Sequence, residues 1–134
     1  MLGHLGINVS DLQQAKAYYD QIMPLLGFEL YRHDADQFAF RRVGGKPGTY
    51  IFFYPALETS SFSRHHTGLQ HLAFIVPTRE AVHAVHTKIQ ELGGDILYTP
   101  QEFPQYHLGY YAMFWLDPEG LMLEAVCHRP TPDM

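Results

Sequence analysis

The sequence has little of several features that mark whole classes of protein. It has a single cysteine, Cys127, which excludes an intrachain disulfide and a zinc site with two cysteine ligands. Its 9 basic residues are outnumbered by 14 acidic ones, and Arg41-Arg42 is the only adjacent basic pair, so it lacks the basic patch of a nucleic-acid-binding protein. No apolar run approaches the roughly 20 residues that a membrane-spanning helix needs.

The first basic residue is Lys16, so the N-terminal region lacks the charged beginning of a secretory signal peptide. Together with the single cysteine, this predicts a cytoplasmic protein without nucleic-acid or membrane partners. With 46% hydrophobic and only 17% charged residues, the 134-residue chain is long enough and apolar enough for one compact domain. Its 9 histidines are about twice the usual number for this length, and histidine is the commonest metal ligand.

A sequence pattern recurs 67 residues along the chain. Residues 3–9 and 70–76 each alternate apolar with other residues, which is typical of a half-buried strand. Setting His4 on His71 also aligns the apolar positions of the two segments that follow. The chain therefore contains a duplicated unit.

Each of these two strands is followed by a helix-start signal and an amphipathic stretch. Ser10 is the expected N-cap of the first helix, with Gln13 three residues on, and Thr78 is the expected N-cap of the second. Both helices are expected to end at a glycine, Gly27 or Gly94.

Three short β-type runs follow each helix, so each half is predicted to be a βαβββ module. The runs are residues 28–32, 38–43, 50–54, 96–99, 110–116 and 121–126. We expect an α+β fold in which the two modules form one curved, cup-shaped mixed sheet with the helices outside. The single domain, 1–134, would comprise module 1 at about 1–57, a linker at about 58–68, module 2 at about 69–128 and a short tail at 129–134.

Two histidines and a glutamate are predicted to face the concave side of this sheet. Residues two apart on a strand share a face, so His4 and His71 point away from the helices. Glu124 is the only charged residue of the last strand, where a buried carboxylate is costly unless a cation compensates it. Two histidines and one carboxylate from three strands form the facial triad of mononuclear metal sites.

Other side chains are candidates for catalysis or for lining the pocket. If the final hairpin is regular, Tyr111 and Met113 share the face of Glu124, and Tyr111 either donates a proton or packs the sheet. His107, in the preceding loop, is either an acid or base at the mouth of the groove or a surface histidine. An aromatic pocket wall is predicted from three residues that share one face: Tyr50, Phe52 and Tyr54.

These features resemble the vicinal oxygen chelate superfamily, the glyoxalase I, bleomycin-resistance and extradiol-dioxygenase group. The resemblance lies in His4, in Gln70-His71-Leu72-Ala73 and in the Asp117-Pro118-Glu119-Gly120 segment that leads to Glu124. It implies a divalent metal ion on His4, His71 and Glu124. Glyoxalase I enzymes carry a fourth ligand, a carboxylate on the last strand of the first half, but here Phe52 stands opposite Glu124, so that four-ligand site is not reproduced.

The leading expectation is therefore a metal-dependent enzyme of the dioxygenase, isomerase or lyase type. It would use Fe²⁺, Zn²⁺, Mn²⁺ or Ni²⁺ to chelate neighbouring oxygens of a small-molecule substrate, to which the aromatic wall would suit an aromatic part. One alternative is a metal-free protein that binds a small molecule or antibiotic, and another is a structural interaction domain. A homodimer is expected, with the metal site formed within one chain or between two.

Overall fold

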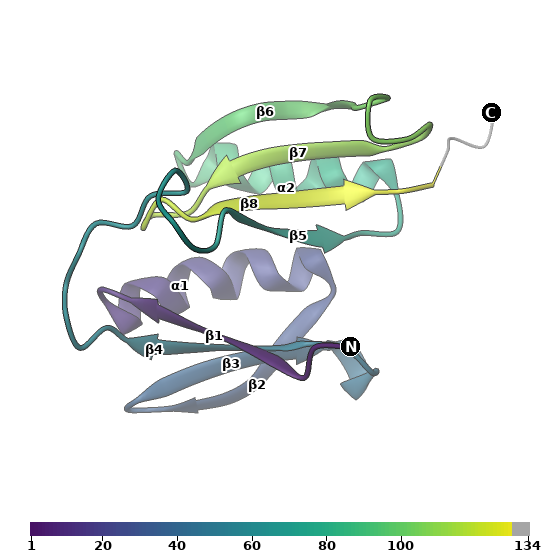
Figure 1. The fold of residues 1–134 in the computed structure, drawn as a ribbon. Helices are drawn as coiled ribbons and strands as arrows, with labels where there is room; N and C mark the ends of the chain where they lie inside the picture. The colour runs from purple at the N-terminus through teal and green to yellow at the C-terminus, as the bar shows by residue number, and fades with distance from the viewer. Residues whose placement is uncertain (130–134) are drawn as a thin grey trace. The chain divides into compact units, whose positions relative to one another are not determined.

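The computed structural model describes residues 1–129, and these form two compact units that divide after residue 60 (Figure 1). The expected tail lies outside the described residues from residue 130 onward. None of the helices in the described part is long and apolar enough to span a membrane.

The first unit is a four-stranded mixed sheet with one α-helix. Its elements are β1 (His4–Val9), α1 (Leu12–Ile22), η1 (Met23–Leu26), β2 (Phe28–Asp34), β3 (Gln37–Arg42), η2 (Val43–Gly45) and β4 (Tyr50–Pro55). The strand order is β1-β4-β3-β2, with β1 parallel to β4 and the other pairs antiparallel.

The second unit repeats this topology. Its elements are β5 (His71–Ile75), α2 (Arg79–Glu91), β6 (Asp95–Glu102), β7 (Tyr111–Leu116) and β8 (Met122–Cys127), in the order β5-β8-β7-β6. The first strand, the helix and the next strand begin 67 residues apart in the two units, at residues 4 and 71, 12 and 79, and 28 and 95. The predicted α+β class and the two βαβββ modules are confirmed.

The helix caps follow the sequence signals with one difference. Thr78 caps α2 as predicted, because its side chain accepts a hydrogen bond from the Ala81 N–H at 3.1 Å. In α1 the cap is Asp11, one residue after Ser10, and its carboxylate accepts from the Gln14 N–H at 3.0 Å. Both side chains can cap a helix, and here the chain begins the helix one residue later than expected.

Proline accounts for two further differences in element length. The first helix ends at Ile22 rather than near Gly27, because Pro24 has no N–H to continue the α-helical pattern, and a 3₁₀ turn follows. Strand β6 extends to Glu102, beyond the expected residue 99, even though it contains Pro100. A proline is tolerated there because β6 is an edge strand of its sheet.

The core of each unit lies where the helix packs on one face of its sheet. In the first unit Tyr19 of α1 packs on Phe53 of β4, with ring centroids 4.5 Å apart. In the second unit, side chains of α2 and of the sheet face beneath it are fully buried: Val82, Val85, Ile89, Met113, Trp115 and Ala125. The opposite face of each sheet carries His4 in the first unit and His71 and Glu124 in the second.

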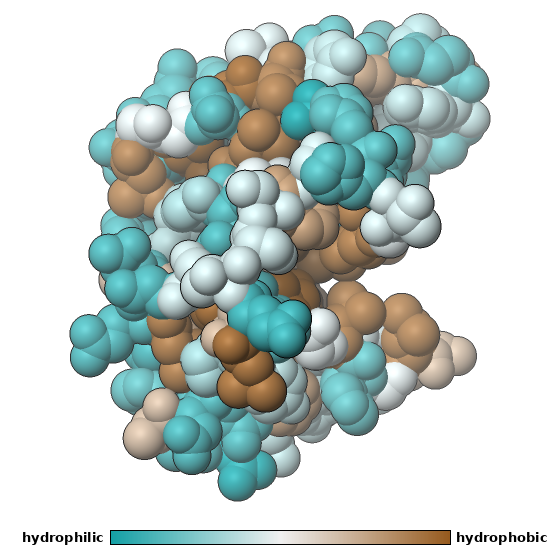
Figure 2. Space-filling model, turned by 60° about the vertical axis from the view of Figure 1, so that its left-hand side comes forward, coloured by the Kyte–Doolittle hydropathy of each residue, from teal (hydrophilic) through white to brown (hydrophobic). Residues whose placement is uncertain are grey.

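Hydrophobic side chains also reach the surface of both units. On the face shown in Figure 2 they form several separate patches among hydrophilic residues. Leu57, Ile75 and Leu108 are among the most exposed. Such scattered exposure is usual for a folded domain.

A buried aspartate fixes the turn that joins β7 to β8. Asp117 is 6% exposed, and its Oδ1 accepts hydrogen bonds from the N–H groups of Glu119 and Leu121, both at 2.9 Å. Gly120 has a φ of +91°, a conformation that favours glycine. Because five residues, 117–121, lie outside the pairing, Leu116 pairs with Met122.

We expect Asp117→Ala to lower the free energy of unfolding by about 1–3 kcal/mol, because two backbone donors lose their acceptor. Asp117→Asn keeps an acceptor oxygen and should cost clearly less. Urea unfolding of both variants measures the difference, and equal losses would contradict this role for the Oδ1 acceptor.

Candidate functional site

His71 and Glu124 lie side by side on the sheet face opposite α2. Strands β5 and β8 are parallel, and their register pairs His71 with Met122 and Ala73 with Glu124, so the two side chains share a face. The distance from His71 Nε2 to Glu124 Oε1 is 3.3 Å. Two of the three predicted metal ligands are therefore neighbours in the second unit.

The preceding residue orients the His71 ring. His71 Nδ1 lies 3.0 Å from the amide oxygen of Gln70, and because that oxygen only accepts hydrogen bonds, Nδ1 carries the proton. In the neutral imidazole Nε2 then presents a lone pair to the carboxylate of Glu124. Two lone pairs face each other favourably only when a proton or a metal ion lies between them.

The burial of Glu124 makes this compensation important. The residue is 1% exposed, and its face of the sheet carries a buried apolar cluster of Phe103, Ala112, Phe114 and Val126. An ionised carboxylate in such surroundings is costly without partners. Two ligands that are each about 2.1 Å from one ion lie roughly 3.0–3.4 Å apart, so the 3.3 Å spacing and the imidazole and carboxylate donors fit a divalent metal.

The third predicted ligand, His4, begins β1 in the first unit. Its ring lies edge-on to Phe52, with centroids 5.4 Å apart. Among residues 1–129, no three His, Cys, Asp or Glu side chains form a group that could hold a metal ion. The structure thus brings His71 and Glu124 together in the second unit, and His4 belongs to the first unit.

A tyrosine that the sequence analysis did not select contacts Glu124. The Tyr110 hydroxyl donates a hydrogen bond to Glu124 Oε2. Burial raises the pKa of Tyr110 above its usual value, and the hydrogen bond to Glu124 and the negative charge there raise it further. Tyr110 is therefore a neutral donor at neutral pH, and it satisfies the second oxygen of the buried carboxylate.

The predicted placement of Tyr111 and Met113 on the face of Glu124 is wrong. Glu124 pairs with Phe114, so the side chains of β7 that share its face are those at even positions. The prediction assumed that only the four residues from Asp117 to Gly120 form the turn. The turn has one residue more, and a shift of one position moves every side chain of a strand to the other face.

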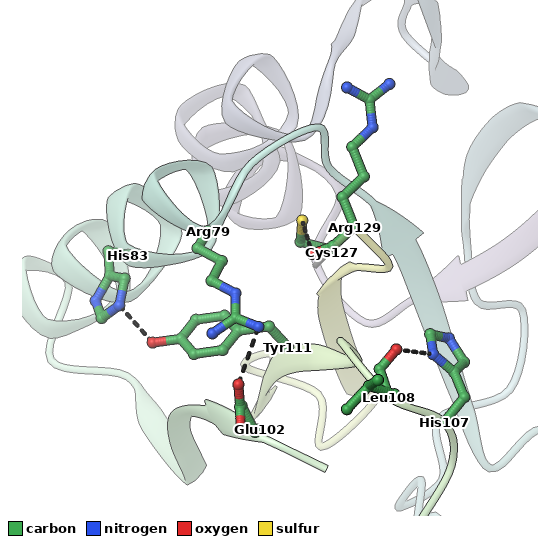
Figure 3. A network of polar contacts seen from close by, with 8 residues as sticks. All are labelled: Arg79, His83, Glu102, His107, Leu108, Tyr111, Cys127 and Arg129. Carbon is green, nitrogen blue, oxygen red and sulfur yellow. Dashed lines mark hydrogen bonds and ion pairs between the residues drawn. The ribbon is translucent and has the colours of Figure 1, made fainter. Parts of the chain in front are cut away.

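Tyr111 instead lies under α2. Its hydroxyl is 2.6 Å from His83 Nε2, and the Arg79 guanidinium lies 4.4 Å from the centroid of its ring (Figure 3). Arg79 also forms an ion pair with Glu102 at 3.0 Å, without the alignment of a hydrogen bond. Met113 is fully buried, so it does not line a pocket. These residues attach the helix to the sheet.

Both ring nitrogens of His107 have partners. Nδ1 donates to the Leu108 carbonyl at 2.9 Å (Figure 3), and Nε2 is 3.0 Å from Nδ1 of His128. The His107 ring also lies edge-on to Tyr110, at 5.2 Å between centroids. In the structure His107 therefore packs against the Tyr110 ring and bonds to Leu108 and His128.

The predicted aromatic wall lies on one face of the first unit. Strand β4 pairs in register with β1, which places Tyr50, Phe52 and Tyr54 on the same face as His4. The rings of Phe52 and Tyr54 stack at 6.2 Å. These three residues share a face as expected.

Two residues extend this wall that the sequence analysis did not name. The Tyr31 ring lies 4.9 Å from that of Tyr50, and the Arg41 guanidinium lies 5.5 Å from the centroid of Tyr31. Glu29 holds Arg41 through an ion pair at 3.0 Å. The pairing of β2 with β3 has a bulge between Leu30 and Arg32. The bulge breaks the regular alternation of side chains between the two faces, so these contacts could not be predicted from the sequence.

Comparison with known proteins gives a consistent result. The sequence profile of the Glyoxalase/Bleomycin resistance protein/Dioxygenase superfamily matches residues 1–125. The Bacillus subtilis protein YqjT is 25% identical over 126 residues, covering 92% of this chain and 95% of that protein.

Solved structures have the same fold. A candidate glyoxalase from Bacillus halodurans is 33% identical, with a TM-score of 0.80 and 95% of each chain covered. The fosfomycin resistance protein FosX from Listeria monocytogenes is 19% identical, with a TM-score of 0.70, covering 95% of this chain and 92% of its own. At that identity the likeness shows the fold alone.

The two adjacent tyrosines allow a matched test of the bond to Glu124. Tyr110→Phe leaves a buried carboxylate oxygen without its donor and should lower the free energy of unfolding by about 1–3 kcal/mol. Tyr111→Phe should cost less, because water can replace the lost partner of the exposed His83. Urea unfolding of the metal-free proteins measures both, and a larger loss for Tyr111→Phe would contradict the assignment.

The raised pKa of Tyr110 predicts a dependence of stability on alkaline pH. Below about pH 10 tyrosine is neutral in both states, and above it the unfolded chain ionises first, so the free energy of unfolding falls as pH rises. Tyr110→Phe should make this fall shallower between about pH 10 and 12. Unfolding series across that range measure the slope, and an unchanged slope would show that Tyr110 does not contribute.

Proposed function

Because the chain belongs to the Glyoxalase/Bleomycin resistance protein/Dioxygenase superfamily, we propose that it is a divalent-metal-dependent enzyme acting on a small molecule. His71 and Glu124 are two ligands of the ion, and His4 is the third. The observation that carries the proposal is the geometry at His71: Nδ1 donates to Gln70, and Nε2 faces a buried carboxylate at 3.3 Å. A divalent ion between Nε2 and Oε1 would be bound by both atoms.

The donor set limits which ions suit this site. Imidazole nitrogen and carboxylate oxygen together suit Fe²⁺, Zn²⁺, Mn²⁺ and Ni²⁺, and three protein ligands leave positions open for substrate and water. When bound, such an ion supplies Lewis-acid polarisation of two neighbouring substrate oxygens. Iron(II) favours reaction with oxygen, whereas zinc, manganese or nickel favours isomerase or lyase chemistry by proton transfer.

The residues of the chain have separate parts in this function. Gln70 keeps the protonated nitrogen of His71 away from Glu124, so that Nε2 is free to bind the ion. Tyr110 donates to the other oxygen of Glu124 and so stabilises the ionised carboxylate in its apolar surroundings. Neither needs to touch the substrate to do this.

The position of His4 in the sequence repeat supports its assignment as the third ligand. His4 and His71 begin equivalent strands, and His4 is exposed on the face opposite α1. The ligand comes either from the same chain or, in a homodimer, from a second copy. Mixing His4→Ala with His71→Ala protein distinguishes the two, because only a shared site regains metal binding in the mixture.

The aromatic face of the first unit supports a substrate with a planar, apolar part. Tyr50, Phe52 and Tyr54 are only partly buried, although they are large apolar rings, and stacking on a planar ligand would cover them. The Arg41 guanidinium, ion-paired with Glu29, lies beside Tyr31 at one end of this face.

Metal content tests the proposal directly. We expect about one divalent ion per chain in protein purified without a histidine tag, by elemental analysis. His71→Ala and Glu124→Gln should both lose it, and His4→Ala should bind it more weakly. His83→Ala is the matched control, because His83 is a histidine of the same unit that bonds to Tyr111 on the helix side.

Retention of the ion by both His71→Ala and Glu124→Gln would refute these ligands. Absence of metal from the wild-type chain, even after anaerobic loading with each of the four ions, would refute the metal-dependent enzyme. In that case the aromatic face would point to a metal-free small-molecule-binding protein.

A further inference from the structure

We infer that Tyr110 restricts Glu124 to binding a metal ion through one oxygen, and so sets the number of positions left open for substrate. The inference rests on the proposed function. Tyr110 is a positioning residue, because it acts through Glu124 and does not itself contact the ion or the substrate.

The two oxygens of Glu124 have different partners. Oε1 lies 3.3 Å from His71 Nε2, where the ion is proposed to bind. Oε2 accepts the hydrogen bond of the Tyr110 hydroxyl. Because the hydroxyl occupies Oε2, a bidentate carboxylate would require this bond to break.

The surroundings hold Tyr110 in this position. Its backbone carbonyl accepts from the Phe103 N–H at 2.8 Å, and its own N–H donates to the His107 carbonyl at 3.2 Å. Its ring packs against several aromatic side chains, with centroids 4.9–6.3 Å away: Phe103, Tyr106, His107 and His128. The tyrosine therefore cannot move away from Glu124 without disturbing the loop before β7.

Glu124 is equally restrained. It lies in the middle of β8, paired with Phe114 on one side and Ala73 on the other, and is 1% exposed. Rotation of its carboxylate would remove Oε2 from the Tyr110 hydroxyl and move it into apolar surroundings. Single-oxygen binding thus follows from the arrangement of these side chains.

The consequence for chemistry concerns coordination number. A carboxylate that binds through both oxygens occupies one more position on the ion than a carboxylate that binds through one. With His4 and His71, single-oxygen binding by Glu124 leaves the larger number of positions for two neighbouring substrate oxygens. By occupying Oε2, the hydroxyl of Tyr110 keeps these coordination positions available to the substrate.

Cobalt(II) alone provides a spectroscopic probe of this arrangement. Full-length wild-type, Tyr110→Phe and Tyr111→Phe proteins are stripped of metal, checked for folding by thermal unfolding, and loaded with Co²⁺ to equal measured occupancy. Visible absorption then reports coordination number, because the d–d bands of cobalt(II) weaken as that number rises. His71→Ala identifies the absorption that belongs to the proposed site.

We expect Tyr110→Phe to show clearly weaker d–d absorption per bound cobalt, because Oε2 is released to bind the ion. Tyr111→Phe should match the wild type, because its hydroxyl lies on the opposite face of the sheet and bonds to His83. Carboxylate infrared bands provide a second readout: the separation of the antisymmetric and symmetric stretches should narrow in Tyr110→Phe as binding becomes bidentate.

Two results would overturn this inference alone. One is identical spectra for wild type and Tyr110→Phe at equal occupancy, and the other is an equal change in both tyrosine variants. Either would leave the proposed function intact, because cobalt would still bind at His71. A wild-type chain that binds no cobalt would overturn the proposed function, and this inference with it.

Discussion

The arrangement of the candidate site in the second unit depends on the burial of one carboxylate. Glu124 is 1% exposed in the middle of a strand, and burying its charge costs free energy. Neighbouring side chains of β8 are buried and apolar, so Glu124 contributes nothing to the hydrophobic core and must be stabilised by polar partners. Tyr110 supplies a hydrogen bond to one oxygen, and His71 lies against the other. A chain that needed only stability at this position could place an apolar residue there. The cost of this carboxylate is consistent with the metal-binding role proposed for it.

The first unit shows what the same topology does without this carboxylate. Phe52 pairs with Gly6, as Glu124 pairs with Ala73, so the two residues occupy equivalent positions in the two sheets. At Phe52 the sheet presents a half-buried aromatic ring, whereas at Glu124 it presents an anion. The two units thus differ on this face: the first carries an apolar aromatic surface, and the second carries the polar pair of His71 and Glu124. His4 and His71 occupy equivalent positions, at the start of β1 and of β5.

The sequence predicted the repeat, the order of elements and the face of His71 and Glu124, because these depend on local periodicity and on an offset that can be counted. It could not predict the pairing of β7 with β8, because register depends on how many residues the turn takes. Leu121 was expected in the strand, but its backbone N–H and carbonyl both bond to Asp117, which keeps it in the turn. Contacts made by loops, such as His107 with His128, also leave no periodic signal in the sequence.

The position of Leu121 in the turn determines which of two adjacent tyrosines donates a hydrogen bond to Glu124. With a four-residue turn, Tyr111 would share the face of Glu124, and Tyr110 would point toward α2. With the five-residue turn, Tyr110 meets Glu124 and Tyr111 meets His83, and each hydroxyl has a partner. The chemistry at Glu124 therefore depends on Asp117, a residue that lies outside the candidate site and acts only by holding the turn. A shift of one position would exchange a tyrosine anchored by its loop for one stacked beneath Arg79, and the carboxylate would lose the donor that the fold provides.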